Sequence, residues 1–278
     1  MIFGEHAKCQ AEAEYPELWQ GLVGAWSPCL SPRGGTVLRD LSGRGNHGTL
    51  TNMDPETDWV TRGGKQALDF DGSNDIVIAS ARSAQASVES GIWTLSTWIY
   101  SRGSGIHHGT SIGTSGTGFL LHFDNGQKIQ TNANGNTEGG KVFQSTNSCI
   151  TRNVWMHLVY RMDANGMRYW ANGVEQGITM FAGTNGPVTY TVGTLLTTSI
   201  GAGWVSNAVN TPHSMIYGES LWHGRALDPV EIALLYRLGP GGWATPRRRR
   251  WNYVTAQTAI PYWVFGRKNA RLIGGGVS

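Results

Sequence analysis

Short runs of alternating apolar and polar residues constrain the fold of this chain more than any other feature of its sequence. They extend from residue 22 to residue 222 and are separated by glycine, asparagine, aspartate and serine, which is typical of antiparallel strands joined by tight turns. Residues 93–100 illustrate the pattern, because alternate side chains of a strand point to opposite faces of its sheet. The predicted core face of this strand consists of Trp93, Leu95, Thr97 and Ile99. The sequence therefore predicts an all-β domain built from antiparallel sheets.

Three turns and one helix can be placed from local residue patterns. Asp163–Gly166 and Asn172-Gly173 each reverse the chain between alternating runs, and Asp124–Gly126 has the same character. The one helix that the sequence strongly favours begins after Asp228, whose side chain can accept hydrogen bonds from the first turn. We expect this helix to stop at Gly239.

Composition excludes several classes of protein. Charged residues make up 15% and hydrophobic residues 40% of the 278 residues, which excludes a disordered chain. No apolar run approaches the roughly 20 residues of a membrane span, so we expect no membrane partner. Cys9, Cys29 and Cys149 are an odd number without CxxC spacing, and a disulfide framework is not expected. Residues 1–9 do not resemble a signal peptide, which favours folding in the cytoplasm.

The net charge of +3 conceals an asymmetry between two parts of the chain. Residues 1–246 contain 15 basic and 19 acidic residues, a net charge of −4. Residues 247–278 contain seven basic residues and no acidic residue, a net charge of +7. Because the basic charge is confined to this last segment, direct binding of nucleic acid is not predicted.

Four segments carry a resemblance to a known family. They read Leu-Val-Gly-Ala-Trp at 22–26, Asp-Leu-Ser-Gly-Arg-Gly-Asn-His-Gly-Thr-Leu at 40–50, Ala-Leu-Asp-Phe-Asp-Gly at 67–72 and Tyr-Trp-Ala-Asn-Gly at 169–173. The ordered set resembles the laminin-G-like, concanavalin A-like jelly-roll family over roughly residues 21–238. The resemblance implies a β-sandwich of two antiparallel sheets. We therefore divide the chain into an N-terminal arm (1–20), a jelly-roll domain (21–238) and a basic, aromatic extension (239–278).

The resemblance implies a fold more firmly than a function, because this fold carries adhesins, lyases, hydrolases and viral structural proteins. The opening of the chain, the run from Asp40 to Met53 and the Arg-rich ending resemble phage-encoded jelly-roll proteins. We therefore expect a structural virion protein of a tailed bacteriophage, such as a capsid decoration protein, held by its terminal arms. Its expected partners are the major capsid protein or other virion subunits, and further copies of itself.

Two alternative functions remain open. The first is a glycan-binding adhesin or receptor-binding module that recognises a host surface polysaccharide. The second is a polysaccharide lyase or hydrolase. The Glu-x-Asp-x-x-Glu strand motif of related glycanases is absent, and Asp69 and Asp71 are expected to serve strand pairing and turns. We therefore predict that the chain is not an enzyme and requires no cofactor.

Calcium is the ion that the family resemblance suggests. Asp40 and Asn46 lie in one glycine-rich loop, and Glu219 opens the last strand, which in a jelly roll could return near the first. Carboxylate and amide oxygens are the hard ligands that Ca²⁺ prefers. The alternative is that the loop side chains only cap their own turn.

If the chain binds a glycan, an exposed aromatic ring is expected to stack on the sugar. Most of the 12 tryptophans lie on predicted strands and are expected in the core or on a sheet surface. Trp204, which follows Gly203 in a glycine-containing segment, is the first candidate for a glycan-binding residue, and Trp59 is the second.

The extension combines four consecutive arginines with aromatic residues, which is unusual for a free tail. Arginines can pair with carboxylates while aromatic side chains fill pockets of a partner. The predicted partner-binding residues are Arg247, Arg248, Arg249, Arg250, Trp251, Tyr253, Trp263 and Phe265. The alternative is a solvated basic run. Residues 5–18 are amphipathic but contain Pro16, and we expect them to form a partly helical arm.

Overall fold

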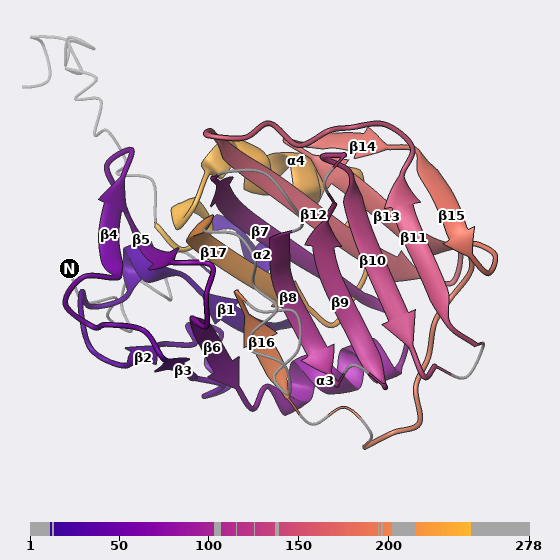
Figure 1. Cartoon of the computed structure of the whole chain (residues 1–278), viewed down its shortest axis with the longest axis horizontal. Helices are drawn as coiled ribbons and strands as arrows, with labels where there is room; N and C mark the ends of the chain where they lie inside the picture. The colour runs from indigo at the N-terminus through magenta and orange to yellow at the C-terminus, as the bar shows by residue number, and fades with distance from the viewer. Residues whose placement is uncertain are drawn as a thin grey trace, which may run out of the picture. The chain divides into compact units, whose positions relative to one another are not determined.

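Two antiparallel sheets packed face to face form the fold in the computed structural model (Figure 1). The structure describes residues 12, 14–102, 107–114, 116–124, 126–136, 139–193, 195, 197–201 and 215–245. The chain divides into two units, residues 1–246 and residues 247–278, and the described residues all belong to the first. Residues 239–245, assigned above to the extension, are therefore part of the same unit as the sandwich.

The first sheet contains eight strands in the order β14-β13-β12-β7-β17-β5-β4, with β1 paired to β17. Their bounds are β1 (Leu22–Trp26), β4 (Trp59–Arg62), β5 (Lys65–Phe70), β7 (Trp93–Ser101), β12 (Trp155–Asp163), β13 (Gly166–Ala171), β14 (Val174–Gln176) and β17 (Met215–His223). Although β17 is the last strand described, it lies inside the sheet, between β7 on one side and β5 and β1 on the other.

The second sheet contains nine strands in the order β15-β11-β10-β9-β8-β16-β6-β3-β2. Their bounds are β2 (Val37–Leu38), β3 (Gly48–Thr51), β6 (Ile76–Ala79), β8 (His107–Gly113), β9 (Gly118–Phe123), β10 (Ile129–Asn134), β11 (Lys141–Ser145), β15 (Ile178–Ala182) and β16 (Thr198–Ile200). The predicted all-β, antiparallel sandwich is confirmed.

The core between the sheets is rich in aromatic side chains. Trp93 of β7 stacks on Trp222 of β17 with ring centroids 5.4 Å apart, and it meets Phe119 of β9 edge-on at 5.3 Å. Because Phe119 comes from the second sheet, these three rings join the two layers. The predicted core face of residues 93–100 is confirmed at its three apolar positions.

The predicted turns also form. Asn172 and Gly173 join β13 to β14 with φ angles of 50° and 79°, the left-handed pair that a tight type I′ hairpin needs. The turn at Asp163–Gly166 joins β12 to β13, and the turn that begins at Asp124 joins β9 to β10.

The helix predicted after Asp228 is α4 (Pro229–Leu238), and its capping box is complete. Asp228 Oδ1 accepts hydrogen bonds from the backbone N–H groups of Val230 and Glu231 at 2.8 Å. Glu231 in turn accepts from the backbone N–H of Asp228. In α2 (Pro16–Trp19), Pro16 occupies the first turn. Glu12 and Glu14 are helical as well, and the helical run is broken at Tyr15, just before Pro16. None of the helices in the described ranges is long and apolar enough to cross a membrane.

A further helix, α3 (Arg82–Glu89), is not predicted from the sequence because its N-cap, Ala81, offers no side-chain acceptor. Tertiary contacts of its last residue stabilise it instead. The Glu89 carboxylate pairs with Arg82 and accepts the backbone N–H groups of Gly193 and Leu195.

The outer side of the first sheet is covered by both end segments of the described chain. A second hydrophobic cluster packs α2, α4 and the 3-10 helix η3 (Gly242–Ala244) against that sheet. Trp19 of α2 lies 4.7 Å from Trp243 of η3, measured between ring centroids. The last residues of the predicted N-terminal arm are therefore docked on their own sandwich.

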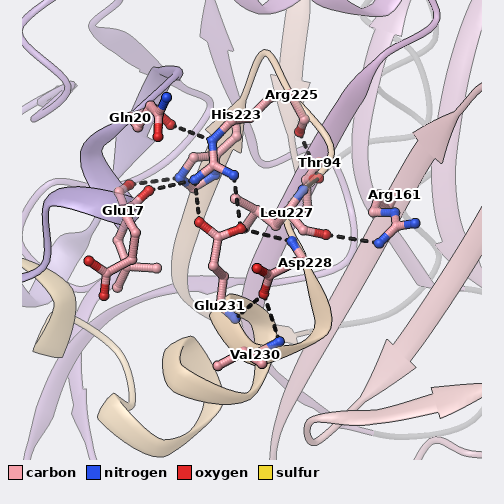
Figure 2. Close-up of polar contacts among 11 residues, drawn as sticks. Glu17, Gln20, Thr94, Arg161, His223, Arg225, Leu227, Asp228, Val230 and Glu231 are labelled. Carbon is pink, nitrogen blue, oxygen red and sulfur yellow. Dashed lines mark hydrogen bonds and ion pairs between the residues drawn. The ribbon is translucent and has the colours of Figure 1, made fainter.

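Arg225 links these covering segments through its guanidinium group (Figure 2). It forms an ion pair with Glu231 of α4 and donates hydrogen bonds to the carbonyl oxygens of Glu17 and Gln20. One side chain thus holds the N-terminal segment and the C-terminal helix in place at the same time.

We predict that Arg225→Ala lowers the free energy of unfolding by about 3 kcal/mol, because it leaves the mostly buried Glu231 carboxylate without its ion pair. Arg168→Ala is the matched control, since its pair with Glu175 is exposed and should contribute less than about 1 kcal/mol. Urea unfolding followed by tryptophan fluorescence measures both. Equal losses would show that Arg225 acts only as a surface charge.

Candidate functional site

A row of polar side chains crosses the outward face of the second sheet. The register places His122 of β9 opposite Gln130 of β10. It places Gln144 of β11 opposite Gln130 on one side and opposite Thr179 of β15 on the other. Residues opposite one another in adjacent strands project from the same face of a sheet. We call His122, Gln130, Gln144 and Thr179 the polar row.

Hydrogen bonds hold the amide groups of this face in fixed orientations. Gln144 Nε2 donates to Gln130 Oε1 at 3.2 Å and to Asp124 Oδ2 at 2.6 Å. Gln130 Nε2 donates to Asn132 Oδ1 at 3.0 Å. Asp124 is itself positioned by the β9–β10 turn, where its Oδ1 accepts the backbone N–H of Lys128 at 2.9 Å. His122 and Gln144 are only 4% and 3% exposed, so the prearranged groups that reach the surface are those of the half-buried Gln130, Asn132 and Asp124.

An exposed aromatic ring lies at the edge of the same sheet. The register between β11 and β15 shifts between Val142 and Phe143, and Phe181 is the extra residue of this bulge. Phe181 is 68% exposed, whereas its neighbour Met180 packs against the core. Because β15 ends the order of the described strands, the Phe181 ring stands at the rim of the polar face.

This combination suits a ligand that carries many hydroxyl groups on an apolar ring. Amide side chains both donate and accept hydrogen bonds, as hydroxyl groups require, and the C–H faces of a sugar can pack on an aromatic ring. None of the outward side chains described on β9, β10, β11 and β15 belongs to a lysine or an arginine. The face therefore offers neutral hydrogen-bonding groups, and the adjoining β9–β10 turn carries Asp124 and Lys128.

None of these residues is among the sequence-based candidates. One signal is visible in the sequence, because the outward positions of β10 alternate as Gln130, Asn132 and Asn134. The contribution of β11 and β15 depends on strand pairing over longer distances, which the sequence does not reveal.

The loop predicted to bind calcium is closed by its own hydrogen bonds. Oδ1 of Asp40 accepts the backbone N–H groups of Ala25 and Ser42 at 2.9 Å. Oδ2 of Asp40 accepts the Ser42 hydroxyl at 2.8 Å and the backbone N–H of Asn46 at 2.9 Å. The Asn46 amide donates to the carbonyl oxygen of Val23. Four donors use the Asp40 carboxylate, which is the arrangement expected of the turn-capping alternative.

Glu219, the third predicted calcium ligand, has other partners. Glu219 is 2% exposed, and its Oε2 accepts hydrogen bonds from Ser27 Oγ at 2.7 Å and from the Gly241 N–H and Trp243 Nε1 at 2.8 Å. Burial raises the pKa of Glu219 to about 7. In the part of the chain that the structure describes, no three His, Cys, Asp or Glu residues are grouped to hold a metal ion. Calcium binding stays a prediction.

The structure contradicts the prediction for Trp59. This side chain is 1% exposed, packs in the core between the sheets and donates from Nε1 to the carbonyl oxygen of Gly35 at 3.0 Å. A sugar cannot stack on this ring, because core side chains between the two sheets cover both of its faces. Trp204 lies outside the described residues.

The predicted partner-binding residues also lie outside the described residues, and their role stays a prediction. These residues are Arg247, Arg248, Arg249, Arg250, Trp251, Tyr253, Trp263 and Phe265.

The two aspartates considered for catalysis have structural partners. Asp69 forms an ion pair with Arg102, and Asp71 Oδ1 accepts the backbone N–H of Ser73 at 2.7 Å. Asp71 therefore caps a turn, as expected, while Asp69 forms an ion pair with Arg102.

Comparison with known families identifies the superfamily of the chain. A laminin-G-type family model, described as the concanavalin A-like lectin/glucanase superfamily, matches residues 71–233, which is more than half of the chain. The chain belongs to this superfamily. The match includes the polar row and Phe181, and it confirms the family resemblance seen in the sequence. No curated protein sequence matches the chain.

Several solved structures share the fold of this chain, although their sequences are less than 20% identical to it. Trypanosoma rangeli sialidase in complex with 2,3-difluorosialic acid matches with 17% identity and a TM-score of 0.56, over 84% of this chain and 38% of the sialidase chain. A mutant of HCR/D matches with 14% identity and a TM-score of 0.56, over 83% of this chain and 57% of that chain. The chain thus spans less than two fifths of the length of these sialidase chains, and the likeness shows the fold alone.

The prediction that the chain is not an enzyme is contradicted by these neighbours. The trypanosome sialidases are enzymes, and they contain the same β-sandwich. The missing Glu-x-Asp-x-x-Glu motif excludes only one arrangement of catalytic carboxylates, so its absence does not support a general conclusion against enzymatic activity.

We predict that Glu219 makes stability depend on pH. Because burial holds the pKa of the folded carboxyl near 7, against an ordinary value of 4.5, the folded state binds the proton more tightly than the unfolded state. This contribution is fully present below pH 4.5 and is lost as the pH rises to about 7. Wild-type protein should therefore lose stability over this range relative to Glu219→Gln, which stays neutral.

Urea unfolding at several pH values measures that difference. Glu175→Gln is the control, because Glu175 is exposed and should show no such trend. A difference between wild type and Glu219→Gln that does not change with pH would contradict the prediction.

Proposed function

We propose that this lectin/glucanase-like sandwich binds a neutral glycan on the outward face of its second sheet. The observation that carries the proposal is the hydrogen-bonded polar row beside the exposed ring of Phe181. Gln130 and Asn132 are half-buried, so their amide groups are held by neighbours and remain reachable.

The described hydrogen bonds use only some of the N–H donors and oxygen lone pairs of these amides. Each amide has two N–H donors and a carbonyl oxygen with two lone pairs, and Gln130 uses one donor and one lone pair within the row. The remaining groups can bind neighbouring hydroxyls of one sugar ring. The outward side chains described on these strands include no acidic residue, lysine or arginine, and the β9–β10 turn beside them carries one acid, Asp124, and one base, Lys128. This balance favours a neutral sugar over a charged one.

Binding to an array of neutral gluco-, manno- and galacto-oligosaccharides tests this function. Phe181→Ala and Asn132→Ala should each weaken binding about fivefold, since each removes roughly 1 kcal/mol of stacking or hydrogen bonding. Val174→Ala is the matched control, because Val174 is 64% exposed but lies on β14 of the other sheet. A blank array, or affinities unchanged by both variants, would refute the proposal.

A second proposed function is that the protein is a structural component of a bacteriophage particle, such as a decoration protein. Both end segments of the described chain pack on the outer side of the first sheet, whereas the polar row faces away from the second. This arrangement favours attachment through the end segments, with the glycan-binding face turned outward. The charge of +7 on residues 247–278 favours an acidic surface of a capsid subunit or of another copy as the partner.

Truncation tests the structural role. A chain ending at Pro246 should keep its fold, because all described residues belong to the unit that ends there. It should lose at least about tenfold in co-sedimentation with DNA-containing particles, whereas the full chain should co-sediment in a salt-sensitive manner. Full occupancy by the truncated chain would show that residues 247–278 do not attach it.

A further inference from the structure

The β4–β5 hairpin forms one end of the first sheet (Figure 1). Aromatic and basic side chains lie together on the outer face of the sheet at this end. Arg62 and Lys65 are exposed and face each other across this hairpin. Tyr100 of β7 pairs in register with Trp155 of β12. We call Arg62, Lys65, Tyr100 and Trp155 the hairpin cluster.

Two glycines make room for the indole ring of Trp155. A Cβ atom at Gly218 of β17 would lie 2.8 Å from this ring, which is closer than real contacts allow. A Cβ atom at Gly63, in the hairpin turn, would lie 3.4 Å from Trp155 Nε1. The ring meets Tyr100 edge-on with centroids 6.0 Å apart and stays half-buried. Trp155 is thus a positioned ring at the surface.

The hydrogen-bonding groups of the hairpin cluster are almost all donors. The Arg62 guanidinium lies 4.1 Å above the Tyr100 ring and donates to the Tyr100 hydroxyl, which uses a small part of its donor capacity. Among the described residues, Arg62 and Lys65 form no ion pair and the Trp155 N–H has no acceptor. The nearby carboxylate of Asp69 is already paired with Arg102.

We infer that the hairpin cluster is a second binding site, for a saccharide that carries a carboxylate group. The exposed part of the Trp155 ring can stack on the sugar ring. Arg62, Lys65 and the indole N–H supply hydrogen-bond donors for the carboxylate. The inference is independent of the proposed neutral-glycan site, because the two sites lie on different sheets and the hairpin cluster is cationic whereas the polar row is neutral. A stacking ring beside paired cations favours an acidic sugar over an acidic peptide, which offers no such ring face.

Calorimetric titration with a short oligogalacturonate, and with its neutral methyl ester, tests the inference. The acid should bind, more weakly as salt rises, because exposed charges are screened. The ester should bind at least about tenfold more weakly, because it lacks the charge that Arg62 and Lys65 recognise. Arg62→Gln should cost a similar factor without unfolding the protein, since Arg62 is exposed. Trp155→Phe, which keeps a ring but removes the N–H, should cost a smaller factor.

Two controls separate this site from the polar row. Arg168→Gln removes an exposed arginine of the same sheet, and Phe181→Ala alters only the second sheet, so neither should change binding of the acid. Equal binding of acid and ester, or unchanged binding by Arg62→Gln, would overturn the inference. Binding of poly-glutamate in place of the oligogalacturonate would also overturn it, by assigning the cluster to an acidic peptide.

Discussion

The insertion of β17 between β7 and the pair β5 and β1 is the contact on which the rest of the structure depends. Its inward residue Trp222 stacks on Trp93 and helps to join the sheets. The contacts are distant in sequence, as shown by the hydrogen bond from Thr97 Oγ1 to the Glu219 carbonyl oxygen, which spans 122 residues. Loop closure over such distances costs entropy, and the contacts of β17 must offset that cost for the sheet to be stable.

The same strand organises the outer side of the first sheet. Leu221 packs in the cluster that covers this side, and Glu219 accepts hydrogen bonds from the segment that contains Trp243. Burial raises the pKa of Glu219 to about 7 and lowers the pKa of His223 to about 4 and that of His157 to about 3. All three shifts favour the neutral form, because a charge buried under the covering helices would lose its hydration.

The two outward faces differ in chemistry although they belong to one sandwich. On the second sheet, neighbouring strands place neutral amides in one row, beginning with the pair Gln130 and Gln144. On the first sheet, a hairpin brings two cations to the half-buried ring of Trp155. Since the core occupies the inward positions, recognition by the strands of this sandwich uses outward positions, and alternation along each strand assigns them.

The sequence by itself determined the fold class, the core face of β7, three hairpin turns and the capped helix α4. These features depend on residues that are neighbours in the chain, such as Asp228 with Glu231 or Asn172 with Gly173. The tertiary structure alone decided that Asp40 is engaged by its own loop, that Trp59 is buried and that Gln144 meets Gln130. Strand pairing, packing and shared hydrogen bonds decide such outcomes, and they join residues far apart in sequence, where local patterns carry no information about distance.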